Sequence, residues 1–134
     1  QIKPHVIVVN ASGASVTMSE LTIRYWYTID GDKTQNFWVD YASRGSSNVT
    51  GTFVKLSTAR SGADYYLEVG FTSGAGSINN GSDSGEIQTR FAKTDWSNYN
   101  ETGDYSYDPT KTSYTTWEKV TLYRNGTLAY GVEP

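Results

Sequence analysis

The chain has 134 residues, of which 11 are Lys or Arg and 14 are Asp or Glu, so its net charge is −3. This length is typical of one domain, residues 1–134, and the acidic balance argues against a nucleic-acid groove, which needs a positive field. No apolar run approaches the roughly 20 residues that span a bilayer. No charged-then-apolar leader follows Gln1, so we expect neither a membrane anchor nor an intact signal peptide.

The residue types that are missing exclude several kinds of site. With no cysteine, the chain has no disulfide, thiolate zinc site or thiol nucleophile, and its one histidine, His5, excludes a multi-histidine metal cluster. The 19 aromatic residues include 11 Tyr and 4 Trp, which combine a broad apolar face with a polar group. This composition suits a carbohydrate-binding surface, and it also fits a tyrosine-rich β-sandwich without that function.

An alternation with a period of two dominates the chain, and no segment of ten residues has a helical period. The predicted strands, in chain order, are 5–10, 21–28, 36–41, 52–56, 65–71, 86–92, 117–124 and 127–130. Clusters of Gly, Ser and Asn, such as 10–13 and 73–81, separate them. Asn125 and Gly126 tolerate positive φ and predict a tight hairpin between the last two strands. Short strands at this spacing predict an all-β sandwich or jelly roll.

The same alternation assigns side chains to the two faces of each strand. The strand at 21–28 is predicted to bury Leu21, Ile23, Tyr25 and Tyr27 and to turn Thr22, Arg24, Trp26 and Thr28 outward. Tyr66 and Glu68 are predicted outward on 65–71, and Gln88 and Arg90 outward on 86–92, opposite Ile87, Thr89 and Phe91. We interpret these outward polar and aromatic sets as candidate recognition surfaces.

Longer motifs add a family resemblance. They are Leu-Thr-Ile-Arg-Tyr-Trp-Tyr-Thr-Ile-Asp-Gly at 21–31, Asn-Phe-Trp-Val-Asp at 36–40, Gly-Thr-Phe-Val-Lys at 51–55, Ala-Asp-Tyr-Tyr-Leu-Glu at 63–68, Arg-Phe-Ala-Lys-Thr-Asp-Trp-Ser-Asn-Tyr at 90–99, Gly-Asp-Tyr-Ser at 103–106 and Gly-Val-Glu-Pro at 131–134. Together they resemble the family 3 carbohydrate-binding modules of bacterial cellulases and scaffoldins, over the whole chain and in the family's order. The resemblance implies a nine-stranded jelly-roll sandwich of two antiparallel sheets, a bound calcium, and binding to crystalline cellulose without cleavage.

The resemblance also implies a flat cellulose-binding row. By position, the row contains Asp40, Tyr41, Arg90 and Trp96, with Arg90 paired to Asp40 and with Gln88 as a polar anchor. Flat rings suit the C–H faces of glucose, and polar groups suit its equatorial hydroxyls. The alternative for Trp96 is a buried indole, but its setting, residues 93–98, is polar and favours exposure.

A shallow groove on the opposite sheet is a second surface that the resemblance implies. Its matching residues are Arg24, Trp26, Tyr66, Glu68 and Tyr105. Linker peptides or single glycan chains are its expected ligands. The alternative is an outer sheet face that carries polar aromatic residues without a binding role.

The resemblance implies a structural calcium site as well. Its ligands would be Thr28, Asp30, Asn100, Gly103 and Asp104. Calcium takes six to eight oxygen ligands and accepts backbone carbonyls readily, so Asn and Gly fit this set. No EF-hand explains the turn at 30–41, because Gln35 and Tyr41 stand where that motif needs Gly and Glu. Without the resemblance, a solvated Asp-Gly turn would be the preferred interpretation.

The chain departs from the family pattern in three places. Residues 1–4 match the start of the family's second strand, so the first strand is missing from this sequence. We therefore expect an unpaired sheet edge. Either the strand was lost, or another chain covers the edge. The loop at 42–47 is short and lacks the tyrosine that scaffoldin members add to the row. Tyr41 replaces the histidine that often follows Asp40 in the family.

These features predict a secreted bacterial module that holds a covalently linked catalytic or scaffold domain on crystalline cellulose. An ancillary module of the same family, which guides single glucan chains beside an endoglucanase domain without anchoring, is the alternative; such modules tend to lack the flat row. A purely structural or adhesive β-module would have no polysaccharide affinity. We expect no glycosidase activity, because no pair of acids stands in a recognisable catalytic motif.

Overall fold

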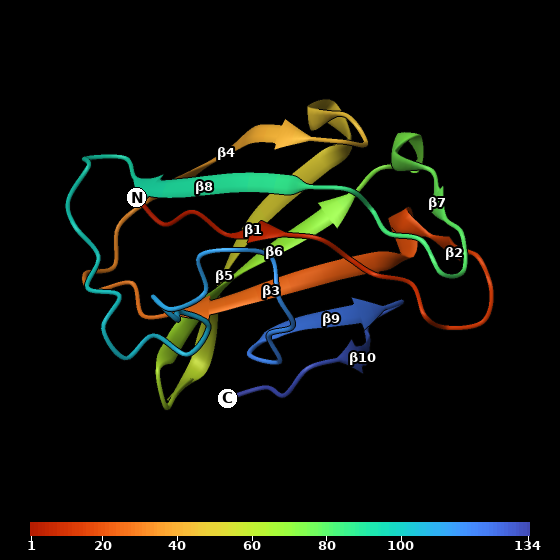
Figure 1. Ribbon diagram of the computed structural model, residues 1–134. Helices are drawn as coiled ribbons and strands as arrows, with labels where there is room; N and C mark the ends of the chain where they lie inside the picture. The colour runs from red at the N-terminus through yellow and green to blue at the C-terminus, as the bar shows by residue number, and fades with distance from the viewer.

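The computed structural model describes all 134 residues, and it consists of short strands stacked in two main layers (Figure 1). The strands are β1 (His5–Val6), β2 (Val16–Thr17), β3 (Leu21–Tyr27), β4 (Gln35–Ala42), β5 (Val49–Arg60), β6 (Ala63–Phe71), β7 (Ser77–Ile78), β8 (Ile87–Lys93), β9 (Val120–Arg124) and β10 (Thr127–Tyr130). The helices are single turns of 3-10 helix, η1 (Met18–Glu20), η2 (Ser46–Asn48) and η3 (Ser73–Ala75). None of them has the length and apolar character that crossing a membrane requires.

All strand pairs are antiparallel, and they form three sheets. One layer has the order β1-β8-β4, the other has the order β10-β9-β3-β6-β5, and β2 pairs with β7 in a small separate sheet. The predicted all-β jelly-roll sandwich is therefore confirmed. The small sheet was not predicted, because its two-residue strands lie among the Gly, Ser and Asn residues that we assigned to loops.

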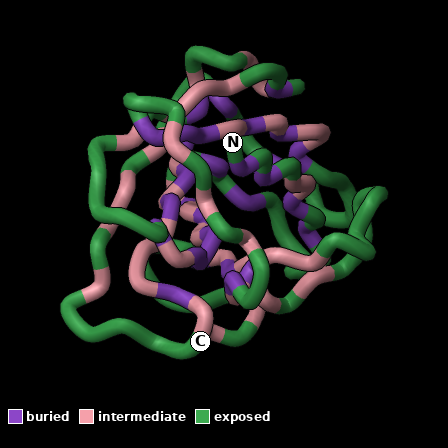
Figure 2. The backbone as a smooth tube through the Cα atoms, turned by 90° about the vertical axis from the view of Figure 1, so that its left-hand side faces the viewer, coloured by how far each residue is buried: buried purple, intermediate pink, exposed green.

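The core lies between the two main layers, where Figure 2 shows the buried segments surrounded by exposed loops. An aromatic cluster centred on Phe91 lies within it, among aliphatic side chains. The Phe91 ring lies 4.8 Å from the ring of Tyr27 and 5.6 Å from the rings of Phe53 and Tyr99. Inward residues of both sheets supply the rings of Tyr27, Phe53 and Phe91, as the period-two alternation predicted for β3 and β8, and Tyr99 comes from the segment after β8.

Several strand boundaries differ from the prediction for identifiable reasons. The segment 5–10 keeps a regular ladder only at β1, because Pro4 has no N–H and the Val8 N–H donates to the Ser84 hydroxyl instead of a carbonyl. The strand predicted at 117–124 begins at Val120, because the Val120 N–H closes a turn onto the carbonyl of Trp117. The strand predicted at 52–56 extends over all of β5.

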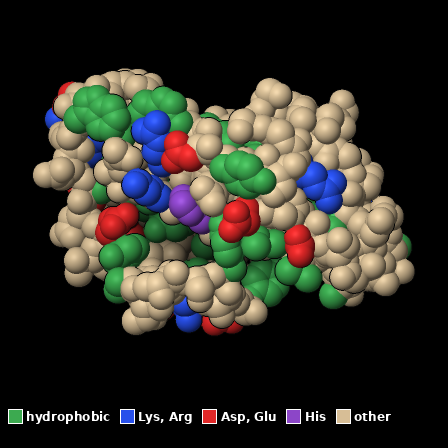
Figure 3. Space-filling view, turned by 45° about the horizontal axis from the view of Figure 1, so that its top comes forward, with side chains coloured by type: hydrophobic (Ala, Val, Ile, Leu, Met, Phe, Trp, Pro, Cys, Tyr) green, Lys and Arg blue, Asp and Glu red, His purple; other side chains and the backbone are tan.

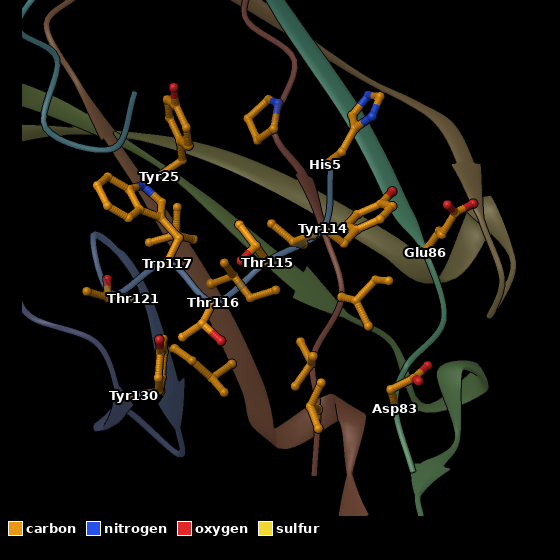
Figure 4. A pocket seen from close by; sticks show the side chains of 18 of the residues that line it. His5, Tyr25, Asp83, Glu86, Tyr114, Thr115, Thr116, Trp117, Thr121 and Tyr130 are labelled. Atoms are coloured by element: carbon orange, nitrogen blue, oxygen red, sulfur yellow. The ribbon is translucent and has the colours of Figure 1, made fainter. Parts of the chain in front are cut away.

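One long side of the sandwich is open. The layer with β1 has three strands and the layer beneath has five, so β9 and β10 extend beyond the edge that β1 forms. The inward side chains of Val120 and Leu122 remain partly exposed and line a groove of about 1200 Å³ between β1 and β9, which residues of the segment 106–117 also line (Figure 4). The unpaired sheet edge expected from the sequence is therefore present at β1.

Candidate functional site

The outer face of β4 and β8 carries most of the residues predicted to form the flat row. Trp38 pairs with Arg90 and Tyr41 pairs with Gln88, and the register shifts between these pairs because Asp40 is an extra residue. A bulge of this kind turns two neighbouring side chains toward one face. Asp40 and Tyr41 are accordingly both exposed, and Tyr41 is 49% exposed.

Arg90 joins the polar and aromatic parts of this face. Its Nε donates to Oδ1 of Asp40 at 2.8 Å, so the predicted pairing of these two residues is confirmed. The Arg90 guanidinium carbon also lies 4.4 Å from the ring centroid of Trp38, within the range of a cation–π contact. Two contacts therefore hold the guanidinium between Asp40 and the ring of Trp38.

Trp96 follows β8 in a tight turn and lies over Trp38. The two indole rings are stacked, with centroids 5.6 Å apart and planes 12° apart. Trp96 is 57% exposed, so the prediction of an exposed indole is confirmed. Its φ of 59° lies in the left-handed region, which costs a residue with a Cβ roughly 1–2 kcal/mol. Such strain at an exposed aromatic side chain indicates a functional position.

We call this set of five residues the platform: Trp38, Asp40, Tyr41, Arg90 and Trp96. It contains four of the five predicted binding residues, and Figure 3 shows large hydrophobic side chains beside basic and acidic ones on this side of the molecule. Gln88 lies next to Tyr41 and donates to the Glu86 carboxylate at 3.4 Å. Trp38 was missed, although alternation along 36–41 already placed it on the face of Asp40.

Four of the five predicted shallow-groove residues belong to β3 and β6 of the five-stranded sheet, and the fifth, Tyr105, lies in the segment between β8 and β9. Arg24 donates to Glu68 at 3.1 Å, and its guanidinium lies 4.4 Å from the Tyr66 ring and 4.2 Å from the Tyr123 ring. Arg24 also lies 3.7 Å from a Glu133 carboxylate oxygen, which brings the C-terminal segment onto this sheet.

Two members of the predicted groove are not free surface residues. Trp26 was predicted to point outward, but it is only 1% exposed, because Tyr66 and Arg60 cover its ring and its Nε1–H donates to the Thr121 hydroxyl at 2.9 Å. The alternation along β3 placed Trp26 on the correct face of the sheet, but alternation does not show which side chains cover that face. Tyr105 lies against the C-terminal segment, and its hydroxyl donates to the carbonyl of Val132.

Most of the predicted calcium ligands meet beside the end of β3. Oδ1 of Asp104 accepts the Thr28 hydroxyl at 2.6 Å and the Thr28 N–H at 3.1 Å, and Oδ2 of Asp30 accepts the Asn100 N–H at 2.8 Å. Gly103 precedes Asp104, and its carbonyl oxygen packs against Gly62. Four of the five predicted residues are therefore linked by hydrogen bonds.

Asp104 supplies the observation that tests a cation at this place. Its side chain is buried, and its Oδ2 has no hydrogen-bond partner. Burial raises the pKa of Asp104 to about 6, and the nearby carboxylates of Asp30 and Glu101 add to this rise. No cluster of three His, Cys, Asp or Glu side chains is present, but calcium also takes hydroxyl and carbonyl oxygens. The oxygen-only set with one unpartnered carboxylate oxygen fits calcium.

Comparison with known proteins agrees with this architecture. A family model described as a cellulose binding domain matches residues 1–131. The chain belongs to the family 3 carbohydrate-binding modules. Exoglucanase-2 of Thermoclostridium stercorarium is 54% identical over 133 residues, which are 99% of this module and 14% of the exoglucanase. Cellulosomal-scaffolding protein B of Acetivibrio thermocellus is 45% identical over 142 residues, which cover 99% of the module and 18% of that protein.

Solved structures show the same fold. The CBM3b of the scaffoldin subunit ScaA from Acetivibrio cellulolyticus has a TM-score of 0.94 and 44% identity, with 98% of this module and 86% of that chain covered. A family IIIA CBD from Clostridium cellulolyticum has a TM-score of 0.88 and 42% identity, with 99% of this module and 87% of that chain covered. These matches are binding modules, which are non-catalytic, and the module spans less than one fifth of the exoglucanase and of the scaffolding protein.

Proposed function

We propose that this module adsorbs to the flat face of crystalline cellulose through the platform. The observation that carries the proposal is the stack of Trp96 on Trp38, which leaves Trp96 exposed beside the paired Arg90 and Asp40. Exposed and rigidly held aromatic and arginine side chains are typical of residues that dominate binding energy.

The chemistry of a glucan chain matches this arrangement. Its sugar rings present C–H groups above and below, which aromatic faces cover, and hydroxyl groups at the edge, which Arg90 and Asp40 can bind as donor and acceptor. β4 and β8 hold most of the platform, so little conformational entropy is lost on binding. The mechanism is adsorption by a preformed surface, and we infer that no bond in the polysaccharide is broken.

We infer that the module acts within a longer secreted protein. Relatives join modules of this kind to an exoglucanase or form part of a cellulosomal scaffold. Adsorption would hold a covalently linked catalytic or scaffold domain beside the substrate, which raises the effective concentration of the linked domain.

We also propose that calcium stabilises the loop that follows the platform. Asp104, Thr28 and Asp30 would hold the ion, with backbone carbonyls of Asn100 and Gly103 completing the set. Calcium would neutralise the buried carboxylate of Asp104, whose Oδ2 otherwise has no partner. A thermal melt with added calcium tests this assignment, and an unchanged midpoint would contradict it.

The function is tested by depletion of the module from solution by microcrystalline cellulose. We expect Trp96→Ala and Arg90→Ala to remain largely in solution, whereas Tyr130→Ala, which removes an exposed ring from β10, should bind like the wild type. Equal depletion of all variants would refute the platform assignment. Depletion by amorphous but not crystalline cellulose would favour the ancillary role that guides single glucan chains.

A further inference from the structure

Lys93, the last residue of β8, has an unusual environment for a lysine. It is only 1% exposed, and its Nζ donates to the carbonyl of Asp30 at 2.8 Å and to the carbonyl of Asn98 at 3.3 Å. The Nζ also lies 4.9 Å from the ring centroid of Tyr99. No carboxylate lies within ion-pair distance of it, so backbone carbonyls and one aromatic face are its partners.

Burying an ammonium group of this kind costs free energy, and its contacts must offset that cost. Removing an ion from water carries a penalty of several kcal/mol, and apolar residues of similar volume often serve stability equally well. Methionine has nearly the length of lysine and would pack among Phe91 and Tyr99, which border this end of the strand. The hydrogen bonds that the Lys93 ammonium donates are therefore better explained by the loop that they hold in place than by their contribution to stability alone.

The contacts of Lys93 lie on both sides of Trp96. The Lys93 carbonyl accepts the Trp96 N–H at 2.9 Å, and the Lys93 ammonium binds the carbonyl of Asn98, two residues beyond Trp96. Its third contact, the Asp30 carbonyl, belongs to the turn between β3 and β4. One side chain thus joins the Trp96 loop to the turn that connects the two layers, where Oδ2 of Asp30 also accepts the Asn100 N–H.

We propose that Lys93 is a positioning residue of the platform: its buried ammonium holds the loop that keeps Trp96 stacked on Trp38. This proposal rests on the proposed function, because positioning matters only if the platform binds. The ammonium does not touch the polysaccharide. It compensates the strained left-handed backbone of Trp96 by fixing the loop at Asn98 and Asp30.

Lys93→Met tests the proposal, with Lys55→Met as the matched control. Lys55 is exposed, lies on β5 in the other layer and pairs with Asp32. The first measurement is the set of NMR cross-relaxation signals between the indole rings of Trp38 and Trp96, which requires no ligand. We expect Lys93→Met to lose these signals and to bind microcrystalline cellulose about tenfold more weakly. Lys55→Met should retain both.

A double-mutant comparison separates positioning from a general structural effect. If Lys93 acts only through Trp96, Lys93→Met should cause no further loss of binding in the Trp96→Ala background. A further tenfold loss there would overturn the proposal. So would a folded Lys93→Met variant that keeps the indole signals and the wild-type affinity.

Two further outcomes of these experiments also bear on the proposal. If Lys93→Met does not fold, Lys93→Gln, which lacks the charge and keeps one amide donor group, takes its place in the NMR and cellulose-binding measurements, with the same expected results. If the wild type does not bind cellulose but Lys93→Met still loses the indole signals, Lys93 positions Trp96 and the proposed function is wrong.

Discussion

Removing Trp38 should weaken cellulose binding although Trp38 is the less exposed member of the indole pair. Trp38→Ala deletes the ring on which Trp96 stacks at 5.6 Å and over which the Arg90 guanidinium lies at 4.4 Å. An aromatic pair contributes about 0.5–1.5 kcal/mol and an exposed cation–π contact about 0.5–1 kcal/mol. Together they predict a loss of about 2 kcal/mol, which corresponds to a roughly 30-fold lower association constant.

Depletion isotherms on microcrystalline cellulose measure this loss, and thermal melts show whether each variant is folded. Trp38→Phe keeps a ring under Trp96 and should lose clearly less than Trp38→Ala. Because both indoles act as one unit, the combined loss in Trp38→Ala/Trp96→Ala should be smaller than the sum of the two single losses. Wild-type binding by a folded Trp38→Ala variant, or strictly additive losses, would refute this reasoning.

Four further predictions concern stability. Because burial raises the pKa of Asp104 to about 6, the metal-free fold holds this proton more tightly than the unfolded chain. The resulting stability should be fully present below about pH 4 and should fall as pH rises to about 6 and above, as urea titrations at several pH values can measure. Calcium should raise the melting midpoint at pH 7 and lose this effect near pH 5, and Asp104→Asn should remove it. A Cβ at Gly51 would lie 2.5 Å from the Phe37 ring, so Gly51→Ala should destabilise the fold by about 1–3 kcal/mol in denaturant titrations. Gly126→Ala forces a Cβ to φ 80° in the last hairpin and should lower the free energy of unfolding by about 1 kcal/mol, whereas a neutral result would contradict the turn assignment.

Strand positions and faces were largely predictable because side-chain alternation is a local property. The hairpin at Asn125 and Gly126 is confirmed, with both residues at positive φ and β9 paired to β10. The alternation along β8 is confirmed as well, with Phe91 buried and Arg90 directed outward. The two-residue strands β2 and β7 were not predicted, because strands this short show no periodic pattern in the sequence.

The candidate site was less predictable where it depends on contacts between distant segments. The burial of Trp26 results from Arg60 and Tyr66, which other strands bring over its ring. The buried ammonium of Lys93 depends on carbonyls from two loops, one of them more than sixty residues away in the chain. Such contacts are set by tertiary packing, so neither composition nor periodicity could reveal them.

The mismatch between three strands in one layer and five in the other has a consequence for dynamics. Backbone amides along the outer side of β1 have no ladder partner, and the apolar side chains of β9 that face them are partly hydrated. Hydrogen exchange should therefore be fastest along this margin and slowest in β3, β6 and β8, where each strand has neighbours on both sides. On heating, opening should begin at this margin, while the β4–β8 ladder that carries the platform persists to higher temperature.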